Sequence, residues 1–155
     1  MNIYEKLIKI QSELKAPKSQ YNSFGKYSYR TCEDILNALK PLLAEVKAVV
    51  TIKDEIELIG DRYYIKATSK LIDAESGEEI CNTAYARESR DKKGMDESQI
   101  TGACSSYARK YSLNGLFAID DAKDADSDDN SEENNQISQT TSPQPPSRIR
   151  ERRRG

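Results

Sequence analysis

The amino-acid sequence predicts an α+β fold, in which a three-stranded antiparallel β-meander packs against helices and a long third helix follows the sheet. Two observations support this prediction. Apolar residues repeat with a helical period before residue 47, with the period of a β-strand over residues 50–87, and with a helical period again after residue 96. After residue 119 almost no large apolar residues remain. We therefore expect one folded domain over residues 1–121 and a disordered tail over residues 122–155.

Two amphipathic helices are predicted before the sheet. Residues 2–15 carry an apolar stripe at helical spacing, formed by Ile3, Leu7, Ile10 and Leu14. A proline ends this helix, and the segment 18–30, rich in Tyr, Ser and Lys, is predicted to be a loop or an extended arm. Thr31 and Asp34 have the spacing of a capping box, so the second helix begins there. Pro41 lies inside its apolar pattern and should kink or break it.

Three strands and a third helix complete the predicted domain. Alternation of apolar and polar residues defines the strands, which lie near residues 50–58, 63–71 and 80–87. The turns between them are short, so they form an antiparallel meander with one covered face. Asp96 and Gln99 have the spacing of another capping box, and the third helix runs to about Tyr111. Asn114 and Gly115 suit a left-handed cap at its C-terminal end.

The charge of the chain is close to neutral, with 24 basic and 26 acidic residues. Nine of the acidic and six of the basic residues follow Ile119, so the tail is acidic and polar but ends in the basic run RIRERRRG. Overall charge therefore does not identify a nucleic-acid-binding protein. A DNA site must depend on where the basic residues lie.

The composition argues against several classes of protein. The chain has no histidine, and its three cysteines, Cys32, Cys81 and Cys104, form no CxxC pair, so we expect neither a metal site nor a disulfide framework. No apolar run reaches the length of a membrane span, and the N-terminus does not resemble a signal peptide, which predicts a cytoplasmic protein. A P-loop motif is also absent, which argues against an ATP-driven strand-exchange filament.

The third predicted helix is the most informative segment for function. Its small residues are Gly102, Ala103, Ser105 and Ser106. They are followed by two adjacent cations, Arg109 and Lys110, which lie between Tyr107 and Tyr111. Small residues allow a nucleic-acid strand to approach closely, cations bind phosphates, and aromatic rings stack on bases. The alternative is structural: the cations complement the helix dipole, and the tyrosines belong to the core.

Three other basic segments are candidates for a DNA-binding surface. The loop at residues 26–30 alternates rings and cations, which are Lys26, Tyr27, Tyr29 and Arg30. A second loop leads into the third helix, whose N-terminus favours phosphate, and carries Arg87, Arg90, Lys92 and Lys93. One face of the middle strand is also basic, through Lys66 and Lys70. For each segment the alternative is an ordinary solvated surface.

An acidic cluster begins at the end of the folded part. Its members are Asp120, Asp121, Asp124, Asp126, Asp128 and Asp129. A metal-dependent nuclease could use such carboxylates, but it would need them on rigid elements, and the spacing does not match a calcium-binding loop. A solvated acidic linker is the favoured interpretation.

Two blocks of motifs identify a family. The first block is GMD at residues 94–96, Gln99, Gly102 and SYARKYSL at residues 106–113. The second block lies upstream and comprises KYSYR at residues 26–30, EDI at residues 33–35 and KPLL at residues 40–43. Together they resemble the ERF (essential recombination function) family of phage-type single-strand annealing proteins. The resemblance covers residues 1 to about 121 and does not extend to the tail.

This resemblance implies a protein that binds single-stranded DNA and anneals complementary strands without ATP during homologous recombination. It also implies that the protein uses no cofactor and has no catalytic residues. It also implies a homo-oligomer, either a ring or a filament, of phage or prophage origin. Three alternatives remain at this point. The chain could be a passive single-stranded DNA-binding module, a metal nuclease that uses the Asp120–Asp129 cluster, or a scaffold whose tail recruits a replication or single-strand-binding protein.

Overall fold

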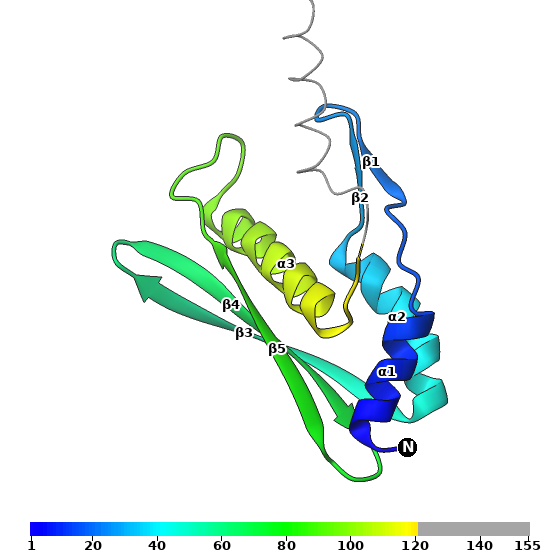
Figure 1. Ribbon diagram of the computed structural model, residues 1–155. Coiled ribbons are helices and arrows are strands. Elements are labelled where there is room, and N and C mark those ends of the chain that lie inside the picture. The colour runs from blue at the N-terminus through cyan, green and yellow to red at the C-terminus, as the bar shows by residue number, and fades with distance from the viewer. Residues whose placement is uncertain (121–155) are drawn as a thin grey trace, which may run out of the picture. The chain divides into compact units, whose positions relative to one another are not determined.

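A computed structural model of the chain describes residues 1–120 and shows the α+β fold that the sequence predicts (Figure 1). The elements follow in the order α1 (Ile3–Glu13), β1 (Gln20–Asn22), β2 (Tyr27–Tyr29), α2 (Cys32–Val46), β3 (Ala48–Ile59), β4 (Arg62–Asp73), β5 (Glu79–Arg87) and α3 (Glu97–Leu116). The proposed tail, residues 122–155, lies outside the described residues. No helix within residues 1–120 has the length and apolar character needed to cross a bilayer.

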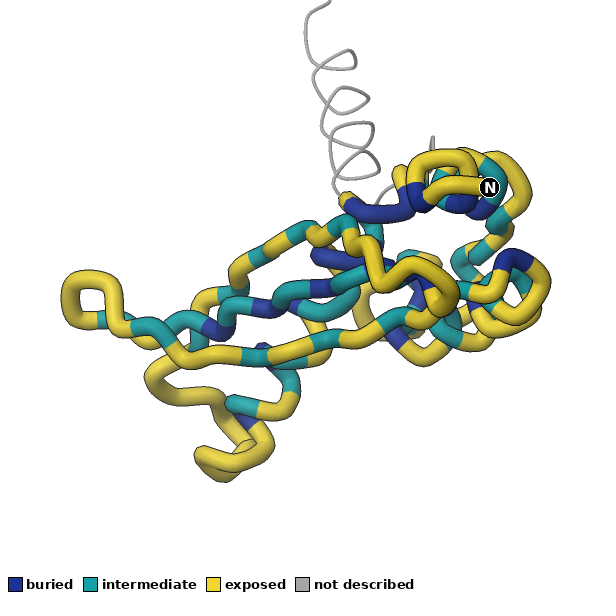
Figure 2. Tube along the Cα trace, turned by 90° about the horizontal axis from the view of Figure 1, so that it is seen from below, coloured by how far each residue is buried: buried dark blue, intermediate teal, exposed yellow. Residues whose placement is uncertain are grey.

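The strands β3, β4 and β5 form the predicted antiparallel meander in that order. The long helix α3 crosses one face of this sheet, mainly over β4 and β5 (Figure 1). From Ile65 on, every second residue of β4 is therefore buried, as Figure 2 shows for the central strand. These buried residues are Ile65, Ala67, Ser69, Leu71 and Asp73. The opposite face of the sheet has no helix from residues 1–120 packed on it (Figure 1).

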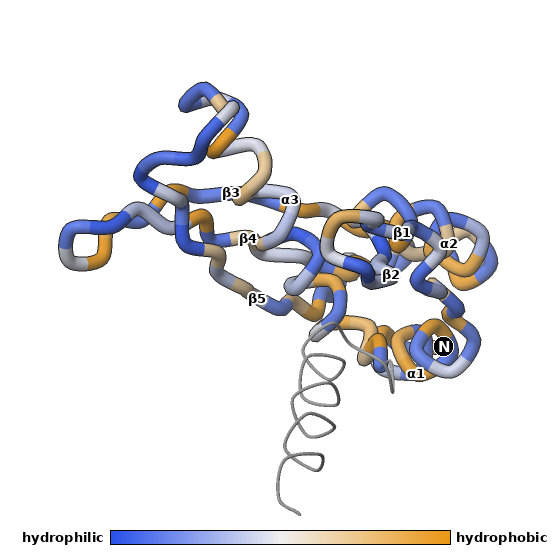
Figure 3. Tube along the Cα trace, turned by 90° about the horizontal axis from the view of Figure 1, so that it is seen from above, coloured by the Kyte–Doolittle hydropathy of each residue, from blue (hydrophilic) through white to orange (hydrophobic). Residues whose placement is uncertain are grey.

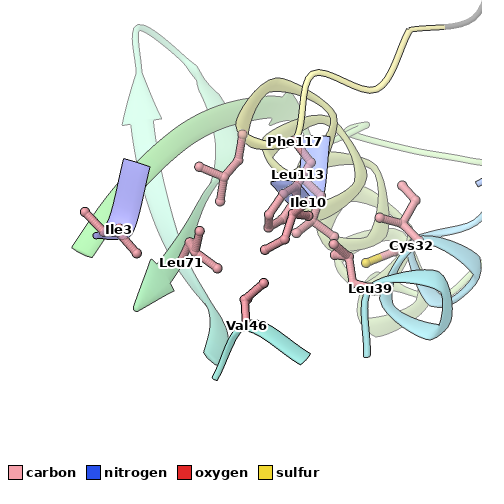
Figure 4. Close-up of a cluster of buried hydrophobic side chains, with 10 residues drawn as sticks. Ile3, Ile10, Cys32, Leu39, Val46, Leu71, Leu113 and Phe117 are labelled. Atoms are coloured by element: carbon pink, nitrogen blue, oxygen red, sulfur yellow. The ribbon is translucent and has the colours of Figure 1, made fainter. Parts of the chain in front are cut away.

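The main core lies where α1, α2 and the C-terminal end of α3 meet one end of the sheet. Its buried residues come from all of these elements and include Ile3, Ile10, Ile35, Leu39, Val46, Leu71, Leu113 and Phe117 (Figure 4). A smaller cluster beneath α3 consists of Ile65, Ala67, Cys104 and Ala108. Small residues on α3 thus allow the helix to lie close to the sheet.

The helix N-termini follow the local rules that the sequence predicts. The capping boxes of Thr31 with Asp34 and of Asp96 with Gln99 are both formed. Helix α2 continues through Pro41 to Val46, so the proline does not divide it. Buried apolar residues on both sides of the proline hold the helix against the core, and this packing offsets the lost hydrogen bond.

The predicted left-handed cap at Asn114 and Gly115 is wrong, because α3 continues to Leu116. The left-handed residue is Ala118, with φ 50°. Gly115 instead makes room for the amide of Asn82, since a Cβ at this position would lie 2.4 Å from Asn82 Nδ2. That amide donates to the carbonyl of Ser112 at 3.0 Å. The glycine therefore serves the contact between α3 and β5.

Segment 18–30 is more ordered than the predicted loop, because it contains the short hairpin of β1 and β2. The Asn22 side chain builds its turn by accepting the backbone N–H groups of Phe24 and Gly25, each at 3.0 Å. Asn22 also donates to the hydroxyl of Tyr27 at 3.1 Å. Phe24, at the tip, is 98% exposed. The hairpin thus leads directly into the N-terminus of α2.

A buried ion pair that the sequence did not predict fixes α1 to the sheet. Lys6 Nζ lies 2.7 Å from Asp73 Oδ1, and both side chains are almost fully buried. Two hydrogen bonds lower the pKa of Asp73 to about 2: the larger effect comes from the Lys6 ammonium group and the smaller one from the backbone N–H of Glu75. Asp73 is therefore a charged anchor at the end of β4 throughout the neutral range.

Candidate nucleic-acid interface

One flank of α3 faces the end of β2 and the N-terminus of α2 across a groove of about 280 Å³. We call this the α2–α3 groove. One wall is formed by the consecutive residues Tyr29, Arg30, Thr31, Cys32 and Glu33. The other wall comes from α3 and consists of Ala103, Ser106, Tyr107 and Lys110. The fold thus brings together two segments that lie at least 70 positions apart in the sequence.

Tyr107 and Lys110 of the α3 wall lie beside a second exposed ring, that of Tyr111. Tyr107 and Tyr111 stack with their ring centroids 6.4 Å apart, and the two side chains are 52% and 49% exposed. Lys110 Nζ lies over both rings, at 5.1 Å and 5.3 Å from their centroids. The tyrosines are therefore not core residues. A ring that is half exposed beside a cation can stack on a base while the cation contacts a phosphate.

Small side chains give the groove its depth. Ala103 and Ser106 lie one helical turn from Tyr107 and Lys110 and fill little of the space between the walls. The Ser106 hydroxyl donates to the carbonyl of Gly102 at 3.2 Å, within its own helix. Two of the small residues noted in the sequence thus line the groove. A bulky side chain at either position would fill it.

The opposite wall is partly acidic and its helix N-terminus is already capped. The Asp34 carboxylate accepts the backbone N–H of Thr31 at 2.9 Å, and this hydrogen bond lowers the pKa of Asp34. Glu33 adds a second carboxylate in the first turn of α2. Burial raises the pKa of the Cys32 thiol, which therefore stays protonated. The positive charge available to a phosphate thus comes mainly from the α3 wall.

Two further predicted site residues have structural contacts at the hairpin. Arg30 is buried, and its Nε donates to the carbonyl of Ala16 at 2.6 Å, which ties the end of β2 to the segment after α1. Tyr27 contacts Tyr29 with ring centroids 5.9 Å apart. Lys26 is exposed in the hairpin turn with φ 54°. The predicted cluster at residues 26–30 therefore borders the groove through Tyr29 and Arg30.

Arg109 points away from its neighbour Lys110 and binds a residue that the sequence analysis missed. Its Nε donates to both carboxylate oxygens of Asp54 on β3, at 3.1 Å and 3.0 Å. The hydroxyl of Ser105 donates to the same carboxylate. Asp54 occupies an inward position of β3, in phase with Ile52 and Ile56. This break in the apolar alternation was a signal in the sequence, because a carboxylate on a covered face requires a partner.

The basic residues of the middle strand lie on the face of the sheet opposite α3. Lys66 Nζ is 3.6 Å from Glu57, and Lys70 Nζ is 2.6 Å from Glu79. The hydrogen bond and the charge of Glu79 raise the pKa of Lys70. The two lysines are therefore paired with carboxylates in the structure, and they do not border the α2–α3 groove.

The basic loop before α3 lies at the other end of the helix from the main core (Figure 1). Arg90 forms an ion pair with Asp61 in the turn between β3 and β4. Arg87 ends β5 and is exposed, as are Lys92 and Lys93. Of the predicted site residues, the structure therefore brings Tyr29, Arg30, Tyr107 and Lys110 together, and it leaves this loop as a separate basic surface.

The predicted acidic cluster cannot be placed, because all of its members after Asp120 lie outside the described residues. Within residues 1–120, no group of three His, Cys, Asp or Glu side chains is arranged to hold a metal ion.

Comparison with known proteins confirms the family that the sequence motifs indicate. The ERF superfamily profile matches residues 3–153, and the chain belongs to this family. The chain is also 58% identical over 132 residues to the "Essential recombination function protein" of Salmonella phage P22. The aligned region covers 85% of this chain and 62% of that phage protein, so the chain spans under two thirds of its relative's length. No solved structure gives a significant match.

Proposed function

We propose that this protein binds single-stranded DNA and anneals complementary strands without ATP during phage recombination. Membership of the ERF superfamily supports the proposal, as does the name of the phage relative. The observation that carries it is the α2–α3 groove, where Lys110 lies beside the exposed rings of Tyr107 and Tyr111. Such a combination suits a flexible strand with both phosphates and unstacked bases.

In the proposed mechanism, the groove holds one strand by its backbone. Lys110 contacts a phosphate, and Tyr107 stacks on a base at the mouth of the groove. Neighbouring bases keep their pairing edges exposed, so a second strand can test its register until pairing stabilises the duplex. Each step depends on diffusion and base pairing, which is why no nucleotide hydrolysis is needed.

One protomer offers a groove for only a few nucleotides, so annealing requires a longer binding surface. We therefore propose a homo-oligomer, a ring or a filament, whose protomers place their grooves in series. We also propose that residues 1–121 form the annealing domain. Residues 122–155 would tune binding, with the acidic run competing for the groove and the basic end adding weak phosphate contacts. They could also recruit a replication or single-strand-binding protein.

A strand-annealing assay tests the function. Two complementary oligonucleotides, one with a fluorophore and one with a quencher, are mixed without ATP or magnesium. We expect the protein to accelerate quenching above the spontaneous rate and the Tyr107→Ala variant to do so less. Tight binding of each strand without acceleration would instead identify a passive single-stranded DNA-binding protein and overturn the annealing proposal.

A further inference from the structure

The α3 side of the sheet is only partly covered at β3. Helix α3 contacts β4 and β5 through hydrogen bonds and buried side chains, but it reaches β3 mainly through Ser105 and Arg109. Beyond these contacts, Ile56 and Leu58 are 63% and 58% exposed on this side of β3. Tyr63, opposite Leu58 on β4, is 53% exposed. Figure 3 shows that hydrophobic and hydrophilic segments alternate at this end of the β3–β4 hairpin.

The two outer strands also have unpaired backbone edges within residues 1–120. The order β3-β4-β5 leaves β3 and β5 without a further strand beside them in the described part of the chain. β3 is 12 residues long and β5 is 9 residues long. A long edge strand presents a row of N–H and C=O groups that can pair with another chain.

We propose that β3 of one copy of this chain docks beside β5 of a second copy and continues the sheet from protomer to protomer. Both strands are antiparallel to β4, so they run in the same direction and can form a parallel pair. The inference refines the proposed homo-oligomer by naming the surfaces that form its interface.

The register of the sheet makes this pairing electrostatically favourable. Glu57, Tyr64 and Arg87 form one row across the three strands, on the face opposite α3. If the next copy repeats the sheet without a shift along the strands, its Glu57 lies beside Arg87 of the first copy. Arg87, at the exposed end of β5, therefore lies beside the acidic Glu57 of β3 in the next copy. The attraction between these opposite charges fixes the register of the two strands.

The same arrangement covers the exposed apolar residues. Because α3 lies over β4 and β5, the copy that supplies β5 also brings its α3 next to β3. That helix then shields Ile56 and Leu58, which their own α3 leaves exposed. Burial of two such side chains adds a hydrophobic contribution that backbone pairing alone does not supply.

The interface joins two different surfaces, so a pair of protomers still has one unused β3 edge and one unused β5 edge. Repetition of a heterologous contact produces a closed ring or an open filament. Every protomer then presents its α2–α3 groove in the same orientation relative to the shared sheet. The grooves form a series along the assembly, as the annealing mechanism requires.

Reversal of the charges of Glu57 and Arg87 at the proposed interface between β3 and β5 tests the proposal in the absence of DNA. The oligomeric state of the full-length chain is measured by sedimentation velocity at micromolar concentration. We expect the wild type to assemble, and Glu57→Arg or Arg87→Glu alone to weaken self-association by roughly tenfold or more, because like charges then meet at the interface. The double variant, Glu57→Arg with Arg87→Glu, should recover assembly because the pair is restored in reverse.

Two controls make each result decisive. Lys93→Glu makes the same charge change as Arg87→Glu but lies in the loop, off the strand edge, and should leave assembly intact. Leu58→Glu, at an exposed position, should prevent assembly while circular dichroism shows a folded chain. A monomeric wild type would overturn both the interface and the proposed homo-oligomer. Assembly that survives both single charge reversals, or that the double variant fails to recover, would overturn this interface while leaving the annealing proposal to its own assay.

Discussion

Small residues lie on both sides of α3, but their structural effects on the two sides differ. On the sheet side, Cys104, Ala108 and Ser112 are buried, and Ser112 shares a hydrogen bond with Ser69 of β4. On the groove side, Tyr107 is exposed and Lys110 is half-buried next to small neighbours. Small residues thus bring the helix close to the sheet on one side and leave space on the other. Their presence in a sequence does not reveal which purpose applies.

The adjacent cations show the same division. Successive helical residues point about 100° apart, so Arg109 and Lys110 cannot share one environment. Arg109 is bound by Asp54, whereas Lys110 lies over two tyrosine rings. The first cation therefore joins α3 to β3, and the second is the better candidate for a phosphate contact. The predictions below follow this distinction.

The largest expected effect is on stability. Leu113 is fully buried on the packed side, so Leu113→Ala should lower the free energy of unfolding by about 2–5 kcal/mol. Tyr107 is half exposed, and Tyr107→Ala should lower it by about 1 kcal/mol through the lost stacking with Tyr111. Urea denaturation measures both values. Equal losses in the two variants would show that Tyr107 belongs to the core after all.

The second effect is on DNA affinity. Stacking of a base on an aromatic ring contributes about 1–3 kcal/mol, so Tyr107→Ala should weaken single-strand binding by roughly 5- to 150-fold. Tyr4→Ala provides a matched control, since Tyr4 is 67% exposed on α1 and does not line the groove. Fluorescence anisotropy with an oligonucleotide measures the affinities. A similar loss in both variants would argue against a specific role for the groove.

The smallest expected effect concerns the ion pair of Arg109 and Asp54. A double-mutant cycle of Arg109→Gln and Asp54→Asn should give a coupling free energy of about 1 kcal/mol, reduced by the partial exposure of both side chains. Arg109→Gln should also weaken DNA binding less than Lys110→Gln does. The reverse order of affinities would mean that DNA displaces Asp54 and uses Arg109 directly.

Local rules explain what the sequence could predict. The capping boxes at Thr31 and Asp96 depend on residues three positions apart, and the strand alternation depends on neighbours two positions apart. The order and type of the main elements follow from these short-range patterns. The β1–β2 hairpin was missed because its three-residue strands are too short to show a period.

The candidate site depends on contacts that no local pattern contains. Tyr29 and Lys110 were both predicted as site residues, but only the packing of α2 against α3 places them along one groove. Cys32 and Glu33, which complete its wall, carry no such signal in the sequence. Gly115 shows the same limit, because its function depends on Asn82 of a distant strand.

The salt dependence of DNA binding tests the central claim most directly. Affinity for a single-stranded oligonucleotide is measured across a range of salt concentrations for the wild type, Lys110→Glu and Lys40→Glu, with circular dichroism as the control for folding. Lys40 is an exposed lysine of α2 that does not line the groove. Lys40→Glu therefore makes the same charge change as Lys110→Glu at a site outside the groove. Each phosphate contact contributes roughly 0.7 to the slope of log affinity against log salt.

We expect Lys110→Glu to bind more weakly and to lower this slope by about 0.7 or more, whereas Lys40→Glu keeps the wild-type slope. A folded Lys110→Glu variant with wild-type affinity and slope would contradict the account. The basic loop from Arg87 to Lys93 would then become the leading candidate for the DNA-binding surface.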